Sequence, residues 1–116
     1  MNTQTDYHEG MLRPLQELYE PDGALELVQT MHDDLGRKRR DLQTAVSAKD
    51  RVSAARVAHS LKSEVLIVAA EPLGRALEAA EQALKAGDFE AAVATLQGLM
   101  QRCEILFQRL LVAAGG

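Results

Sequence analysis

Apolar residues recur with the spacing of one helix face along almost the whole chain, and turn signals interrupt this pattern at short intervals. A stripe of this kind is buried most simply against a neighbouring helix. The pattern is clear in four long segments and weaker in a shorter one that precedes "EPDG". It predicts helices at about residues 11–19, 22–47, 50–68, 72–86 and 88–112.

The residues between these segments suit helix ends. Asp50 and Asp88 can each accept hydrogen bonds from the free backbone amides of the helix that follows. Pro72 suits a first helical turn, where its missing N–H would have no partner, and Gly87 can take the left-handed conformation that closes a helix. Because connections this short make neighbours antiparallel, the sequence predicts an all-α fold. We expect an antiparallel up-down four-helix bundle with the short first helix laid across one end.

Composition and charge narrow the class of protein. Aromatic residues make up only 3% of the 116 residues, and this length suffices for one modest core, so residues 1–116 are expected to form a single domain. The net charge of −4 argues against general affinity for nucleic acid or for acidic membrane surfaces. With one cysteine and no long apolar run, we expect a cytoplasmic protein that does not bind membranes. A single bundle of this size with charged outer faces is expected to be a monomer.

Two local features have ordinary structural interpretations. The basic run "RKRR" spreads around its helix and has acidic neighbours, so we expect a solvated helix face rather than a nucleic-acid site. Cys103 falls on the apolar stripe of the last helix, where we expect it to pack as a small apolar group.

His59 stands out within "RVAHSLKSEVL". The core face of its helix is predicted to comprise Ala54, Val57, Ala58, Leu61, Val65 and Val68. Since each residue advances about 100° around a helix, His59 points about 150° away from the centre of that face and should be exposed. Around it lie Ala55 and Arg56 one turn before, Lys62 and Ser63 one turn after, and Leu66 a turn further on. The surrounding patch is small, partly apolar and locally basic, which suits a docking partner and an anion.

The segments "AHSLKS" and "AAEPLGRALEAAEQALKAGD" resemble the histidine-containing phosphotransfer (HPt) domains of two-component phosphorelays. The resemblance runs from about Leu15 to Leu110. In that family a bundle helix carries an exposed histidine between an alanine and a leucine–lysine pair, which correspond here to Ala58, His59, Leu61 and Lys62. A small pair and later elements that we interpret as structural correspond to Ala69, Ala70, Leu77, Glu78, Gly87 and Asp88.

This resemblance implies that His59 accepts a phosphoryl group from a receiver aspartate or hybrid kinase and passes it to a response-regulator aspartate. Lys62 would be the charge partner of the phosphoryl oxygens. The receiver would dock on Ala55, Arg56, Ser63 and Leu66. The stabilising acidic residues and Mg²⁺ ion would belong to the receiver, so no cofactor or metal site is expected in this chain. Response-regulator receivers and sensor or hybrid histidine kinases are the expected partners.

Two departures from the family pattern keep a second function open. Ser63 stands where the family usually has glycine, and its hydroxymethyl group narrows the approach to His59, although it can hydrogen-bond a phosphoryl oxygen. Leu66 and Ile67 occupy positions where related domains often carry polar residues. The alternative is therefore a helical interaction module that binds and regulates a receiver or kinase without accepting phosphate.

Autonomous kinase activity is not expected. The chain contains neither G-x-G-x-x-G nor G-x-x-x-x-G-K-[ST], so it lacks a recognisable ATP-binding loop, and a phosphoryl carrier is expected rather than an autonomous enzyme. A third possibility, a purely structural oligomerisation bundle, would show excess apolar residues on two faces. The presence of both His59 and Lys62 favours the carrier, because binding alone does not need an exposed imidazole beside a lysine.

Overall fold

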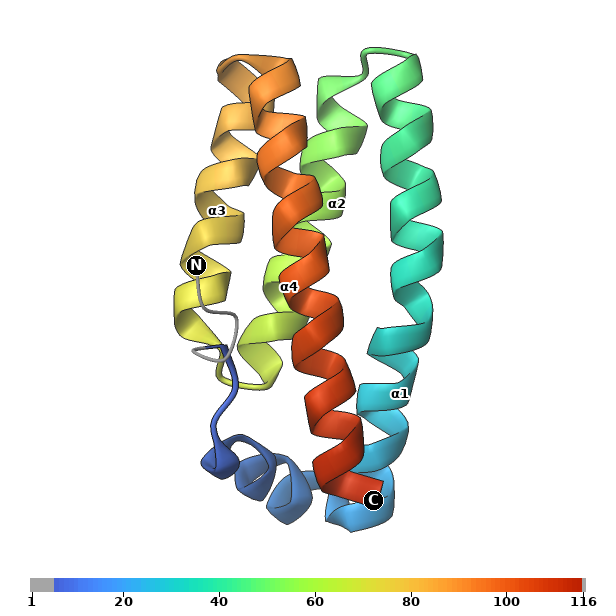
Figure 1. The fold of residues 1–116 in the computed structure, drawn as a ribbon, viewed down its shortest axis with the longest axis vertical. Coiled ribbons are helices and arrows are strands. Elements are labelled where there is room, and N and C mark those ends of the chain that lie inside the picture. Colours follow the sequence, from blue (N-terminus) through green and yellow to red (C-terminus); the bar gives the residue numbers. More distant parts are fainter. Residues whose placement is uncertain (1–5, 116) are drawn as a thin grey trace.

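The computed structural model describes residues 6–115. A short 3-10 helix, η2 (Glu9–Met11), leads into α1 (Leu12–Ser47), followed by α2 (Arg51–Ile67), α3 (Glu71–Ala86) and α4 (Phe89–Gly115). The four α-helices run alternately up and down, and each packs on its neighbours in chain order, with α4 closing against α1 (Figure 1). No strand occurs in the described residues. The predicted all-α antiparallel bundle is confirmed.

Helix α1 breaks near its start. Glu20 has φ 63° and ψ 164°, outside the helical region, and Pro21 follows it. Proline donates no backbone hydrogen bond and disfavours a helical conformation at the residue before it, so the chain turns here. The segment before the break lies across one end of the bundle, at the bottom of Figure 1, as expected for the short first helix. Leu12 and Leu15 are buried there, whereas Tyr19 lies next to the break and is 51% exposed.

The first two turns of the bundle contain left-handed residues other than glycine. Lys49 has φ 53° and Ala69 has φ 61°. In each turn this residue donates its amide to the carbonyl three residues back, and the next amide donates to the carbonyl five residues back. These bonds satisfy carbonyl groups that a helix end leaves without partners. The small pair Ala69 and Ala70 therefore closes α2.

The turn between α3 and α4 corrects one detail of the prediction. Gly87 has φ −99° and ψ −157°, which is extended rather than left-handed. A Cβ atom there would lie 3.0 Å from the carbonyl oxygen of Ala83, a tight contact with backbone that glycine avoids. Asp88 caps α4 as expected, since its carboxylate accepts a hydrogen bond from the Ala91 amide at 3.2 Å. Asp50 caps α2 in the same way.

The core between the helices is mainly aliphatic. Its largest fully buried side chains are Phe107, Leu35, Leu61, Leu73, Leu77, Leu84, Leu96, Met100, Leu106, Leu110, Val28 and Val65. Cys103 is buried among them, as expected, and burial raises the pKa of its thiol to about 12, which makes the reactive thiolate scarce. None of the helices in residues 6–115 is long and apolar enough to cross a membrane.

The basic run "RKRR" is not simply a solvated face. Lys38 is buried, and its ammonium lies 2.5 Å from Asp34 on the same helix and 3.2 Å from Glu64 on α2. Arg39 points elsewhere and pairs with Glu104 of α4 at 2.8 Å. The prediction is wrong for Lys38 because consecutive helical residues point in different directions, and this one faces the packed side of α1.

Candidate functional site

His59 lies midway along α2 and contacts α3. Its side chain is 58% exposed, and its Nδ1 atom lies 3.3 Å from Oε1 of Glu81, whose own side chain is only 9% exposed. An ionised carboxylate can only accept hydrogen bonds, so Nδ1 carries the hydrogen in this contact, and in the neutral ring the lone pair then belongs to Nε2. Nδ1 is therefore held by Glu81. The rest of the ring, which carries Nε2, is open to solvent.

Lys62 follows His59 by one turn and also contacts α3. Its ammonium donates a hydrogen bond to Oε1 of Glu78 at 2.5 Å and lies 3.7 Å from Oε1 of Glu81. The hydrogen bond with Glu78 raises the pKa of Lys62 and, with a smaller contribution from Gln82, holds the pKa of Glu78 below its ordinary value. Lys62 is therefore a charged side chain shared between two carboxylates.

Glu81 connects the groups of the site. Its Oε1 atom faces His59 and Lys62, and its Oε2 atom lies 3.2 Å from the ammonium of Lys85. Burial opposes ionisation of Glu81, but hydrogen bonds from Lys85 and His59 outweigh it and keep the pKa of the carboxyl below its ordinary value. A largely buried carboxylate that stays ionised can stabilise positive charge on the imidazole ring.

The contribution of α3 was not predicted from the sequence. Neither Glu81 nor Lys85 was assigned to the site, and Glu78 was interpreted as structural. The sequence did indicate that Glu81 needs a partner, because it shares a helix face with Leu77, four residues before it, and Leu84, three residues after it. A carboxylate inside an apolar stripe needs a polar partner, and here that partner set includes His59.

The predicted docking surface is partly exposed. Arg56, Ser63 and Leu66 lie at the surface, whereas Ala55 is 2% exposed and belongs to the core. Ala55 was predicted to touch the receiver, and this prediction needs correction. It lies one turn before His59 on α2, and its methyl group is too short to reach the surface, although the imidazole of His59 does.

Ser63 and Leu66 have defined positions beside His59. The Ser63 hydroxyl donates to the backbone carbonyl of His59 at 3.2 Å, which turns it back toward its own helix. Leu66 and Ile67 are 46% and 48% exposed. Leu66 lies against Gly74 of α3, where a Cβ atom would come within 2.7 Å of its Cδ2 atom. The surface next to His59 therefore continues as apolar side chains toward the end of α2.

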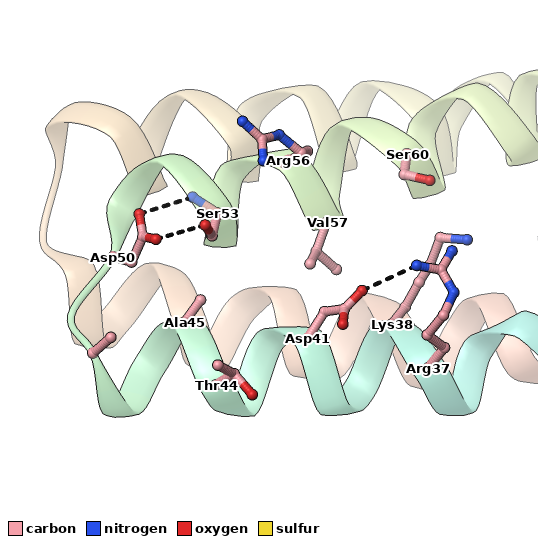
Figure 2. Close-up of a pocket in the computed structure, with 11 residues that line it drawn as sticks. Arg37, Lys38, Asp41, Thr44, Ala45, Asp50, Ser53, Arg56, Val57 and Ser60 are labelled. Atoms are coloured by element: carbon pink, nitrogen blue, oxygen red, sulfur yellow. Dashed lines mark hydrogen bonds and ion pairs between the residues drawn. The ribbon is translucent and has the colours of Figure 1, made fainter.

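A groove of about 400 Å³ lies on the other flank of α2, toward α1 (Figure 2). Two pairs of its polar side chains bond with one another, Asp41 with Arg37 and Asp50 with Ser53, as Figure 2 shows. Arg56 is the predicted site residue that lines it, and His59 does not. Among residues 6–115, no three His, Cys, Asp or Glu side chains are grouped so that they could hold a metal ion.

Comparison with known families gave a match that covers most of the chain. The family model described as Hpt domain matches residues 26–113, which include all of α2 and α3 and most of α1 and α4. This chain belongs to the Hpt domain family. The Hpt domain implies a phosphotransfer role in two-component signalling, in which such domains interact with receiver domains and kinases. Searches of curated proteins and of solved structures gave no significant match.

Proposed function

We propose that this Hpt domain accepts a phosphoryl group on Nε2 of His59 from a receiver aspartate or hybrid kinase and passes it to a response-regulator aspartate. The supporting observation is the exposed imidazole whose Nδ1 is held by Glu81. A carrier needs an accessible nucleophile, because the partner must bring the phosphorus in line with it. The exposed side chains of Arg56 and Leu66 offer the partner a contact surface around the ring.

In the acceptance step, the Nε2 lone pair attacks the phosphorus of the acyl phosphate on the partner's aspartate. The N–P bond forms as the P–O bond to the aspartyl group breaks, and the carboxylate leaves with the electron pair. No proton transfer is required, since Nδ1 keeps its hydrogen throughout. The ring becomes positively charged, and the same step run in reverse delivers the phosphoryl group to the next aspartate.

The side chains around His59 suit this change of charge. Glu81 faces the ring nitrogen that keeps its hydrogen and stabilises the positive ring. Lys62 lies one turn along α2, from where its ammonium can interact with the phosphoryl oxygens. The domain supplies a nucleophile and charge partners, and the remaining catalytic groups come from its partner.

The direct test mixes the purified domain with a receiver carrying labelled phosphate on its aspartate. Acid-labile, alkali-stable label should appear on the wild type and be absent from His59→Gln. Glu81→Gln should still be labelled, but about tenfold more slowly, which corresponds to roughly 1.4 kcal/mol of transition-state stabilisation. Glu71→Gln removes an exposed carboxylate of the same helix and should behave as the wild type.

The alternative function makes the opposite prediction. Measurable binding of receivers without label on the wild-type domain would favour a non-transferring interaction module. In that case Ser63→Gly, which restores the usual family residue, becomes the informative variant, because regained labelling would identify the serine as the cause.

A further inference from the structure

Lys62 is held on the α3 side of the site. It shares a flank of α2 with His59, but its ammonium is hydrogen-bonded to Glu78 and also lies near Glu81. A phosphoryl group on Nε2 of His59 would therefore compete with these carboxylates for the same cation. This competition concerns the energy of the phosphorylated state and rests on the proposed function of His59.

Glu78 is the partner that can most easily be lost. Its side chain is 45% exposed, and its second oxygen accepts a hydrogen bond from Gln82 at 2.9 Å. Glu81 differs, because it is largely buried and also contacts the His59 ring and Lys85. Water can replace Lys62 at the exposed Glu78 carboxylate, whereas a buried Glu81 without its partners would be costly.

The charges of the site balance before phosphorylation. Lys62 and Lys85 offset Glu78 and Glu81, and an imidazole with a free Nε2 lone pair adds no charge of its own. A phosphoryl group brings about two negative charges, while the ring gains one positive charge that lies next to Glu81. The phosphorylated site thus holds excess negative charge, and the Glu78 carboxylate adds to it without touching the ring.

We propose that Glu78 is a positioning residue that holds Lys62 toward α3 and thereby lowers the equilibrium affinity of His59 for the phosphoryl group. The ion pair stabilises the empty site, and the carboxylate repels the occupied one. Both effects favour transfer to the partner's aspartate. In a carrier, this bias promotes release of the phosphoryl group rather than its storage.

The experiment measures how labelled phosphate distributes between the domain and a receiver when transfer has reached its plateau. Glu78→Gln keeps the shape and an acceptor oxygen for Lys62 but removes the charge. It should shift the ratio of phosphohistidine to phosphoaspartate about threefold to tenfold toward the domain, as expected for one unit charge near the phosphoryl oxygens at a partly screened surface. Raising the salt concentration should reduce this shift.

Glu71→Gln is the matched control. It removes the same charge from the same helix. Glu71 lies ten residues, or roughly 15 Å along the helix axis, before Glu81, which contacts the His59 ring, so Glu71→Gln should leave the ratio at the wild-type value. Lys62→Met tests whether Glu78 acts through Lys62. If Glu78 acts by holding Lys62, the shift caused by Glu78→Gln should be clearly smaller in the Lys62→Met background.

The outcomes separate the two proposals. If the wild type is labelled on His59 but Glu78→Gln keeps the wild-type ratio, or shifts it toward the receiver, the role of Glu78 is wrong and the carrier function stands. An equal shift in Glu71→Gln, or an undiminished shift without Lys62, also overturns the positioning role. If wild-type His59 takes no label from any receiver that binds, the proposed function itself fails.

Discussion

Lys38 and Lys62 each contact two carboxylates and join α2 to a neighbouring helix, but their surroundings differ. Lys38, between Asp34 and Glu64, has a side chain that is only 4% exposed. Lys62 is 20% exposed, and its nearest partner, Glu78, is 45% exposed. Similar chemistry thus forms a closed contact on the α1 side of α2 and an open one on the α3 side. Rearranging the closed contact would cost more free energy, because it is buried, whereas the open contact can respond to a new charge.

The largest expected effect is the loss of the closed lysine. Lys38→Met leaves Glu64 beside Asp34 without their shared cation, and breaking a buried ion pair costs about 3 kcal/mol or more of the free energy of unfolding. Lys62→Met should cost far less, because the exposed Glu78 is rehydrated. Chemical denaturation of both variants at neutral pH measures the difference. Similar losses would remove the distinction between the two contacts.

The carboxylates of the two contacts should respond to pH with opposite sign. Burial raises the pKa of Glu64 above its ordinary value of 4.5, whereas the hydrogen bond from Lys62 lowers the pKa of Glu78. The folded protein therefore holds the Glu64 proton more tightly than the unfolded chain does, so the contribution of Glu64 to stability falls as pH rises above 4.5. Glu78 contributes stability above that pH, and this contribution is lost as pH falls through its lower folded pKa.

Two neutral variants make this contrast measurable. Relative to the wild type, Glu64→Gln should gain stability as pH rises from about 4.5 to 7. Over the range from about 3 to 5, Glu78→Gln should lose relative stability as pH rises. Free energies of unfolding measured across both ranges provide the check. Curves for the two variants that run parallel would mean that the environments of the two carboxylates do not differ in this way.

The smallest expected effect compares glycines on the helices that flank α2. In Gly36→Ala on α1, the new Cβ atom would lie 3.6 Å from the end of Arg40, an ordinary contact, so the variant should gain up to about 1 kcal/mol from helix propensity. Gly74→Ala on α3 should gain less, because Leu66 must move. Its main effect should be weaker receiver binding, measured by titration. A stronger gain in stability for Gly74→Ala would show that Leu66 is not held there.

The bundle could be predicted from the sequence because its determinants are local. Periodic apolar residues, Asp50, Asp88 and the break before Pro21 all act within a few residues of their position. The conformation of Gly87 was harder to predict, because both extended and left-handed glycine can end a helix, and here glycine avoids a tight contact with the carbonyl of Ala83.

The site was predictable only in part. The angle of His59 on its helix indicated exposure, and the spacing to Lys62 placed both on one side of α2. Which residues of α3 they meet depends on how that helix is rotated and how far it is shifted along α2, and spacing within one helix does not contain this information. The burial of Lys38 left a clearer trace, because it lies at helical spacing between Leu35 and Leu42 on the buried stripe of α1.

The left-handed residues Lys49 and Ala69 have a consequence for how this domain can change. A side chain in that conformation costs roughly 1 to 2 kcal/mol, so each of the two turns carries strain that glycine would relieve. Neither residue is among those that contact His59. Glycine at either turn would therefore raise the stability of the bundle. This added stability can compensate for destabilising substitutions elsewhere, including those that adapt the surface around His59 to a new partner.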